Sequence, residues 1–360
     1  MNREHIVESF FKKDHILTKE ALDFLEDRDV EEFLNREYKN TVLMEADFIA
    51  GIRVLKNLIH KPKETTTEDF LQFYTSKYEK LRKIIMERLP KDYVSLNKLD
   101  SSRNEVYVIG IVKDIKDTDK KIIELEDPTT TMSVIFDKNE KNIEDIELDD
   151  VIAVKATAAG KVIYGKQILF PDTPLRQPVR GVGKACFISD IAVDESPMQT
   201  EAVFKWLETE DIANVFVLGK IGDIEKFESL VDEYCTNKNV VVSVVGKEFP
   251  SLAEAFQSRR IISLSNPAMI EVGGIKVMLS SRMDMQKIKK RHIGKSDIVL
   301  AEDYLVIEDV PDIVHHSSNE PTIQNYKSIT LVSAGSPSAR FAPVLVDLAT
   351  REASFVEKFK

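Results

Sequence analysis

The 360-residue chain has few of the residues that mark several protein classes. Its two cysteines, Cys186 and Cys235, have no CxxC spacing, which excludes a disulfide scaffold and a cysteine-rich zinc site. No apolar run reaches the roughly 18 residues of a membrane-spanning helix, and the N-terminal MNREHIVESFFKKDH is charged where a signal peptide is apolar. We therefore expect a cytoplasmic protein with no membrane partner, associated with the nucleoid if it acts on DNA.

The overall composition is that of a globular protein with a marked acidic balance. Hydrophobic residues make up 43% and charged residues 31% of the chain, and a chain of 360 residues predicts two to three domains. Fifty lysines and arginines against 61 acidic residues give a formal net charge of -11. Proteins that coat nucleic acid unaided are normally basic, so any contact with nucleic acid must come from a local patch or from a partner.

Helical spacing dominates the first 95 residues. Apolar residues recur at three- and four-residue steps from Thr66 to Leu89, and Thr66 with Asp69 forms a plausible N-terminal cap. Upstream, Asp29 and Glu32 form a second capping pattern. We predict a small helical domain over residues 1–60 and a helical segment over residues 61–100.

Short β-branched runs follow from Glu105 onward. Five such strands at fairly regular spacing predict a small barrel over residues 101–175. A five-stranded Greek-key barrel of the oligonucleotide-binding (OB) type is our first expectation, although the strand count also fits other small barrels. Tyr107, Phe136 and Tyr164 are candidates for stacking bases, with burial in the barrel core as the alternative. The five runs lie at 106–112, 121–126, 132–136, 151–157 and 161–170.

After a proline-rich linker at 171–181, apolar strands and helices alternate to the C-terminus. Continuous apolar strands separated by helices predict a sheet that is covered on both faces, within a domain over residues 180–360. Strands are expected at 185–190, 214–220 and 240–246, helices at 197–210 and 224–235, and further strands at KVMLS, DIVLA, YLVIED, SITLVSAG and VLVDL.

Several longer motifs, taken in order, are quite specific. They are FLQFYTSKYEKLRKIIMER (70–88), LEDPT (125–129), FPDTP at the barrel exit, SNPAMIEVGG (265–274), KKRH (289–292) and EDYLVIEDVPDIVH (302–315). Together they resemble the small, B-type subunit of archaeal family D DNA polymerases, which is related to the regulatory B subunits of eukaryotic replicative polymerases. The resemblance implies an α+β multidomain protein with a helical N-terminus, an OB-type barrel and a calcineurin-like metallophosphoesterase αβ sandwich.

In active members of that family the sandwich is a 3′-to-5′ exonuclease that holds two divalent metals, such as Mn²⁺ or Mg²⁺, at the strand ends. Only Asp190 and Asp223 keep a matching ligand type in this chain. The resemblance thus predicts a degenerate site, with no metal bound by this chain and its own exonuclease activity lost. We further expect the Lys220 ammonium to enter the former metal cavity and neutralise Asp190. The departing positions are Ala192, Lys220, Lys247, Glu248, Phe249, Ser281, Ser318 and Glu320.

Two further groups of polar residues are candidates for binding. The densest positive stretch, RMDMQKIKKRHIGK at 282–295, predicts contacts with a DNA backbone, and a solvated loop is the alternative. The adjacent His315 and His316 are expected at the surface or in a loop and not as ligands. The DNA-binding candidates are Arg282, Lys287, Lys289, Lys290, Arg291 and Lys295.

The leading hypothesis is an accessory small subunit that scaffolds a replicative family D DNA polymerase. The resemblance implies that its partner is the catalytic large subunit, which carries a zinc-bearing C-terminal segment, and that DNA is reached through this heterodimer or a larger assembly. One alternative is an active metal-dependent 3′-5′ exonuclease subunit with an altered site. Another is a stand-alone single-stranded-DNA-binding OB protein. The acidic balance and the lost ligands disfavour both.

Overall fold

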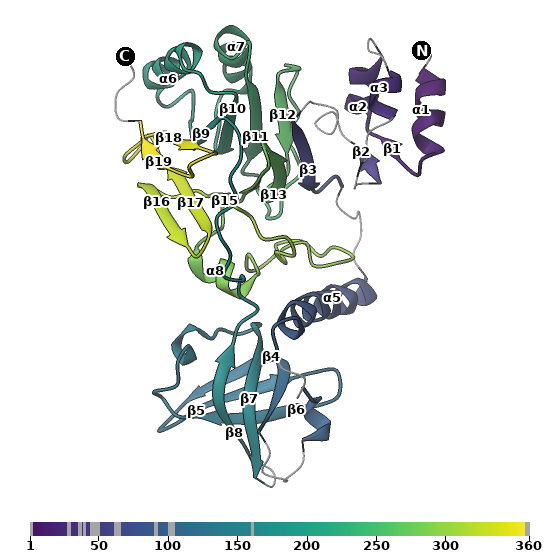
Figure 1. Ribbon diagram of the computed structural model, residues 1–360, viewed down its shortest axis with the longest axis vertical. Coiled ribbons are helices and arrows are strands. Elements are labelled where there is room, and N and C mark those ends of the chain that lie inside the picture. The colour runs from purple at the N-terminus through teal and green to yellow at the C-terminus, as the bar shows by residue number, and fades with distance from the viewer. Residues whose placement is uncertain are drawn as a thin grey trace. The chain divides into compact units, whose positions relative to one another are not determined.

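The computed structural model describes residues 3–26, 30–34, 38, 41–43, 51–60, 66–89, 93–99, 105–159 and 162–356. The protein combines α and β structure in two compact units (Figure 1). Unit 1 comprises residues 1–61, 175–283 and 311–360, and unit 2 comprises residues 62–174 and 284–310. The segment 284–310, which the sequence placed with the C-terminal domain, thus belongs with the barrel. A search of the described residues finds no helix with the length and apolarity to span a membrane.

Unit 1 contains two six-stranded sheets. The first has the order β12-β11-β10-β9-β18-β19, and its strands are parallel from β12 to β9. It comprises β9 (Lys184–Ser189), β10 (Asn214–Gly219), β11 (Asn239–Val244), β12 (Ile261–Leu264), β18 (Val344–Asp347) and β19 (Ala353–Phe355). The second has the order β16-β17-β15-β14-β13-β3. It comprises β3 (Ile52–Lys56), β13 (Ala268–Val272), β14 (Ile275–Leu279), β15 (Ile313–His315), β16 (Pro321–Tyr326) and β17 (Ile329–Ala334).

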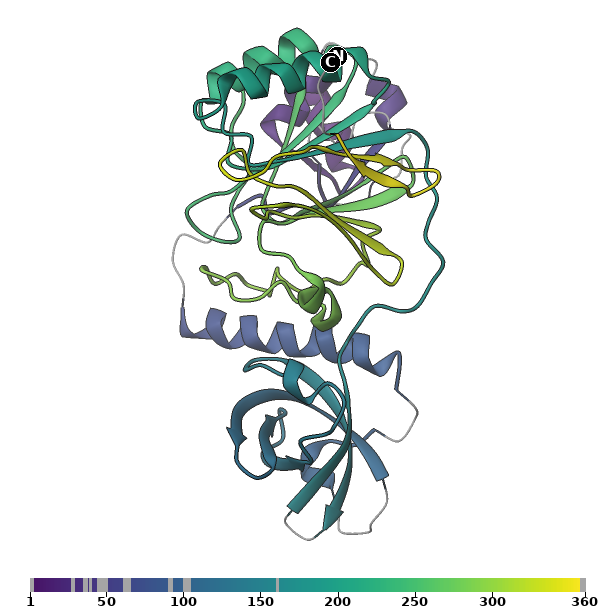
Figure 2. The same ribbon diagram turned by 90° about the vertical axis from the view of Figure 1, so that its left-hand side faces the viewer.

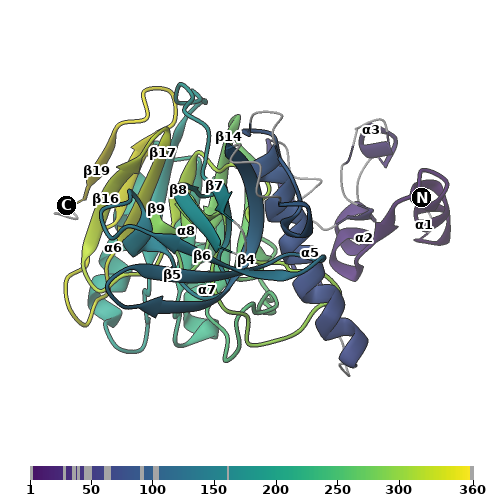
Figure 3. The same cartoon turned by 90° about the horizontal axis from the view of Figure 1, so that it is seen from below.

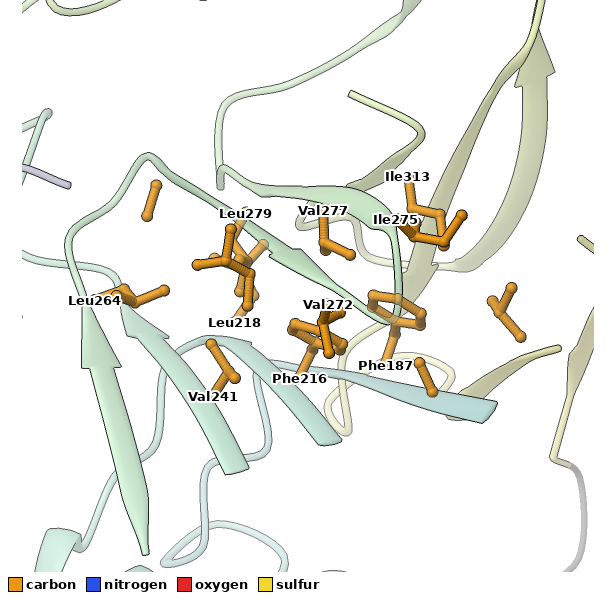
Figure 4. Packing of buried hydrophobic residues seen from close by; sticks show 14 of the residues in the cluster. Phe187, Phe216, Leu218, Val241, Leu264, Val272, Ile275, Val277, Leu279 and Ile313 are labelled. Atoms are coloured by element: carbon orange, nitrogen blue, oxygen red, sulfur yellow. The ribbon is translucent and has the colours of Figure 1, made fainter. Parts of the chain in front are cut away.

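The first sheet is buried on both faces because successive apolar residues point to opposite sides of each strand. Phe187 and Phe216 stack with ring centres 4.9 Å apart and pack against the second sheet (Figure 4). Cys186 and Val215 point the other way, toward α6 (Pro197–Thr209) and α7 (Ile224–Tyr234), which cover that face (Figure 2). The predicted alternation of strands and helices is therefore confirmed over residues 185–246.

The N-terminal residues are not all helical, as they were predicted to be. Helices α1 (Arg3–Phe11), α2 (Lys19–Leu25) and α3 (Val30–Leu34) share a small core, and β1 (Ile16–Leu17) pairs in parallel with β2 (Val42–Leu43). Residues 52–56 form β3, which pairs antiparallel with β13. The local period is two, since Ile52 and Val54 are buried and Arg53 between them contacts Glu271. The predicted capping residue Asp29 lies outside the described residues.

Unit 2 contains a closed five-stranded barrel in the order β4-β5-β6-β8-β7, which confirms the five predicted strands (Figure 3). The strands are β4 (Glu105–Asp117), β5 (Lys121–Glu126), β6 (Thr131–Phe136), β7 (Val151–Ala159) and β8 (Val162–Leu169). Helix α5 (Thr67–Met86) begins at the predicted capping box of Thr66 and Asp69 and packs on the barrel through Leu81 and Ile85. Short helices are η1 (Leu96–Lys98), η2 (Ile143–Asp145) and α8 (Met285–Lys290).

Two predicted strands, DIVLA at 297–301 and YLVIED at 304–309, are wrong. Both segments are irregular, apart from an isolated bridge between His292 and Val306. Leu305, Val306 and Ile307 are nevertheless buried, and Val306 packs in the core between α5 and the barrel. A short apolar run indicates burial and does not by itself distinguish a strand from an irregular buried segment.

Candidate functional site

Asp190 directly follows β9, and its carboxylate packs against the end of the neighbouring parallel strand β10. Asp190 has φ 47°, and its Oδ1 accepts a hydrogen bond of 2.9 Å from the main-chain N–H of Lys220. Gly219, with φ 113°, lies against this carboxylate so closely that a Cβ would sit 2.2 Å from Oδ1. Burial raises the pKa of Asp190, and the Lys220 N–H acts in the opposite direction. The carboxylate therefore links the end of β9 to the end of β10 through a hydrogen bond.

The Lys220 ammonium does not take the place that we expected for it. The hydrogen bond to Asp190 comes from the Lys220 main chain, and the Lys220 side chain is exposed. Its positive charge still lowers the pKa of Asp190, but less than burial raises it. Lys247 and Glu248, after β11, are exposed as well. The predicted neutralisation of Asp190 thus comes from the Lys220 main chain and from the charge of its exposed ammonium, and no ion pair joins the two side chains among the described residues.

Two further positions of the family's metal-ligand pattern, Ala192 and Asp223, make structural contacts. Ala192 is buried, and its N–H donates to the Lys220 carbonyl. Asp223 caps α7, since its Oδ1 accepts the N–H of Lys226 at 3.0 Å. Both residues sit in the connections that follow β9 and β10. Asp223 is exposed at the helix end, where its charge also suits the helix dipole.

The positions that follow β11, β14 and β15 are likewise occupied by local contacts. Phe249 is buried beneath the guanidinium of Arg282, which lies 4.6 Å from the ring centre. Ser281 is held by Asn266, whose Nδ2 donates to Ser281 Oγ at 2.8 Å and whose Oδ1 accepts the Ser281 N–H at 3.1 Å. Ser318 donates to the carbonyl of Glu320.

A buried polar cluster at the end of β15 was missed by the sequence reasoning. His315 is fully buried, and its Nε2 lies 3.0 Å from Ser189 Oγ, which in turn lies 3.3 Å from Ser333 Oγ. Burial lowers the pKa of His315 to about 3, so the imidazole is neutral at pH 7. Its Nδ1 is buried without a hydrogen-bond partner among the described residues.

The expectation that His315 and His316 lie at the surface or in a loop is wrong for His315, which is in β15, while His316 follows the strand but is buried. β15 is an interior strand whose two edges pair with β14 and β17, and all three of its residues are fully buried. His316 is buried as well, and its Nε2 lies 3.1 Å from Thr322 Oγ1. The apolar residues Ile313 and Val314 just before the pair were the signal that could have indicated a buried strand.

A two-metal centre does not fit this arrangement. In the parts of the chain that the structure describes, no three or more His, Cys, Asp or Glu side chains gather where they could hold a metal ion. Asp190 uses Oδ1 on the Lys220 N–H, and Asp223 uses Oδ1 on the N–H of Lys226. The two carboxylates that match the family pattern are thus engaged in main-chain contacts, and we derive no reaction step through a metal.

The predicted DNA-binding stretch is divided between the two units, and its central residues are buried in unit 2. Lys289 Nζ contacts Asp145 Oδ2 at 2.7 Å, and Lys290 Nζ contacts Glu147 Oε2 at 2.6 Å and Asp150 Oδ2 at 2.9 Å. We call these five residues the clasp. They join the segment 284–310 to the acidic loop that precedes β7.

The remaining members of the stretch differ in their surroundings. Arg291 is buried and donates to the carbonyls of Ile307 and Glu308. Lys287 forms an ion pair with Asp284 at 3.2 Å, and Lys295 is exposed. The cations of Lys289, Lys290 and Arg291 are therefore used inside unit 2, and phosphate contacts by Arg282, Lys287 and Lys295 stay a prediction.

The three barrel aromatics also differ in exposure. Phe136 is fully buried in the barrel core, where its ring lies so close to Gly165 that a Cβ there would be 2.1 Å from Cε1. It cannot stack on a base, and the core alternative holds for this residue. Tyr107 is half-buried, while Tyr164 is exposed, with Lys120 Nζ 5.9 Å from its ring centre.

Comparison with known proteins connects this geometry to one family. No family model matches the chain. The DNA polymerase II small subunit of Archaeoglobus fulgidus is 26% identical over 74% of this chain and 69% of the relative. The protein of the same name from Methanothermobacter thermautotrophicus is 22% identical over 74% and 72%, and that of Thermoplasma acidophilum is 22% identical over 93% and 86%. Over most of its length, the chain is thus similar to archaeal DNA polymerase II small subunits.

Proposed function

We propose that this chain is the accessory small subunit of a replicative family D DNA polymerase and that it assembles with the catalytic large subunit. The observation that carries this proposal is the extent of the similarity. The match to the Thermoplasma relative covers 93% of this chain, so it includes residues of both compact units and not one shared domain alone. DNA is then reached through the complex, since the chain itself has a net charge of -11.

We further propose that the two units are an OB-type barrel and a calcineurin-like phosphoesterase sandwich. Support for the barrel comes from its closed five-stranded order, in which β8 lies between β6 and β7 and so departs from the sequence order. Support for the sandwich comes from the two packed sheets of unit 1 and from the helices on the outer face of the first sheet.

The chain's own exonuclease site is proposed to be inactive. Two-metal hydrolysis needs carboxylates and imidazoles with free oxygen and nitrogen atoms at the strand ends. Here Asp190 and Asp223 accept main-chain N–H groups, and Ala192 and Ser281 stand where the family pattern has histidines. A carboxylate that is fastened to a neighbouring strand end is poorly placed to bridge two cations.

Co-expression with the large subunit encoded in the same genome tests the proposal. We expect one complex in size-exclusion chromatography that extends a primed DNA template, while the chain alone releases no nucleotides with Mn²⁺. If no complex forms, the accessory-subunit proposal fails. Mn²⁺-dependent release by the chain alone that Asp190→Ala abolishes would support the exonuclease alternative. Tight binding of single-stranded DNA without the partner would support the stand-alone alternative.

A further inference from the structure

Helix α5 carries one apolar stripe, which is covered in its C-terminal half and only partly covered in its N-terminal half, where Phe73 is buried but Phe70 and Tyr74 are exposed. Tyr78, Leu81 and Ile85 are buried in a core that includes barrel residues of β4 and β7. At 3.6 residues per turn, Phe70 and Tyr74 lie on the same face as these residues, one to two turns nearer the N-terminus. Figures 2 and 3 show the N-terminal turns of α5 extending beyond the barrel strands.

The uncovered part of the stripe is unusually apolar for a helix surface. Phe70 is 48% exposed, Leu71 is 71% exposed and Tyr74 is 50% exposed. We call these three residues the α5 patch. Single exposed apolar residues are ordinary, but contiguous aromatic and aliphatic side chains mark contact sites. Tyrosine is also enriched among the residues that dominate binding energy at protein interfaces.

The charges beside the α5 patch are acidic. Glu68 is exposed, and Asp69 is partly exposed in the same helical turn. The first two lysines after the patch are engaged elsewhere, since Lys77 is buried and Lys80 forms ion pairs with Glu302 and Glu308. An occupant of the patch would therefore be favoured by an apolar face that is bordered by lysine or arginine, and the phosphates of DNA would be repelled.

We propose that the α5 patch docks an amphipathic helix of the catalytic large subunit, bordered by basic residues. This inference rests on the proposed function. The spacing of the three anchors fits a helix partner, because side chains at i, i+1 and i+4 form a continuous ridge that another helix can pack against. The partner helix would extend the packing that the barrel already makes with the C-terminal half of α5.

The test compares two double variants of the full chain that carry equal added charge. Leu71→Lys with Tyr74→Lys places two cations in the patch, and Gln72→Lys with Met86→Lys places two cations on the opposite, exposed face of the same helix. We expect the patch variant to raise the Kd for the purified large subunit by about 30-fold or more, as loss of a hot spot does. The control variant should bind within about twofold of the wild type, since it leaves the anchors intact.

The possible results separate the two proposals. If the wild-type chain does not bind the large subunit, the proposed function fails. If the wild type binds and the patch variant binds equally well, the docking inference is overturned. A lower melting temperature of the patch variant, measured on the free chain, would mean that the chain itself covers the patch, which also overturns it. Should the lysine variant misfold, Leu71→Ala with Tyr74→Ala provides the same comparison without added charge.

Discussion

Lys290→Met is expected to destabilise unit 2 because it leaves a buried carboxylate without its cation. The Lys290 side chain is 9% exposed and contacts two acids of the clasp that differ in burial. The Glu147 side chain is 79% exposed, whereas that of Asp150 is 12% exposed. Water can replace the ammonium at Glu147 but hardly at Asp150, so the loss is concentrated on Asp150.

The expected magnitude follows from this difference. An exposed ion pair contributes about 0–1 kcal/mol, while removing one partner of a buried pair costs about 3–5 kcal/mol. Asp150 also accepts the N–H of Glu147 at 2.8 Å, so it keeps one hydrogen bond in the variant. We therefore expect Lys290→Met to lower the free energy of unfolding of unit 2 by about 2–3 kcal/mol at pH 7.

The loss should depend on pH in a definite direction. Burial raises the pKa of Asp150 even with the Lys290 ammonium beside it, and removing that cation makes protonation easier still. A group whose pKa is raised on folding contributes stability at low pH and loses it as the pH rises through the folded-state pKa. The deficit of Lys290→Met should thus be smaller at pH 4 than at pH 7, because protonated Asp150 needs no cation.

Native-state hydrogen exchange measures this deficit in each unit separately. Peptides from β7 should exchange faster in Lys290→Met, while peptides from β10 should not change. The single tryptophan, Trp206, lies in α6 of unit 1, so its fluorescence in denaturant follows that unit and should not change either. Lys287→Met, at a partly exposed residue of the same helix, is the matched control, expected to change stability by no more than about 0.5 kcal/mol.

The opposite pattern would refute the clasp. Lys290→Met could instead leave hydrogen exchange in β7 unchanged and reduce, by about one, the slope of log K against log salt for polymerase binding to primed DNA. Lys290 would then be a phosphate contact. A double-mutant cycle with Asp150→Asn adds a second criterion, since a real pair should show a coupling energy of about 0.5–3 kcal/mol.

Three further predictions concern the strand ends of unit 1. Because folding lowers the pKa of His315, the wild type should lose stability as the pH falls from 7 to 4, and His315→Gln should flatten the melting temperature over that range; an unchanged slope would contradict the burial argument. Gly219→Ala should cost at least about 2 kcal/mol in thermal unfolding, and combining it with Asp190→Ala, which removes the opposing carboxylate, should recover part of the loss. Asp223→Ala should cost about 1 kcal/mol by denaturant unfolding, and Asp223→Ser should restore most of it if the residue acts as a cap.

The barrel and the first sheet could be predicted from the sequence because their signals are local. Strands of the barrel are short, β-branched and separated by turn residues, and all five lie where the runs placed them. The capping box at Thr66 and Asp69 is equally local, since both partners lie within one helical turn. The strands and helices of residues 185–246 were predictable because their apolar runs are long and regular.

The errors arise where a distant segment decides the structure. β3 becomes a strand by pairing with β13, more than 200 residues later. The run at 304–309 is apolar because Val306 packs in the core of unit 2, although the run forms no strand. At the candidate site, the resemblance identified the altered positions but not their contacts. That Asp190 accepts from the Lys220 main chain, and not from its ammonium, depends on the positive φ of Asp190, which no sequence pattern indicated.

The clasp shows why a run of cations is an ambiguous signal in an acidic protein. The run at 282–295 and the acidic loop EDIELDD at 144–150 lie far apart in the chain, so each looks like a solvent-exposed charged segment on its own. In the folded protein, lysines of the basic run form ion pairs with the acidic loop. They then attract phosphates less strongly, because a carboxylate less than 3 Å away largely cancels the electrostatic field of a cation. Three of the six cations of the densest basic run, Lys289, Lys290 and Arg291, are thus used inside unit 2 and contribute little field toward DNA. In the proposed complex, we therefore expect contact with DNA to depend on the large subunit more strongly than the sequence alone suggested.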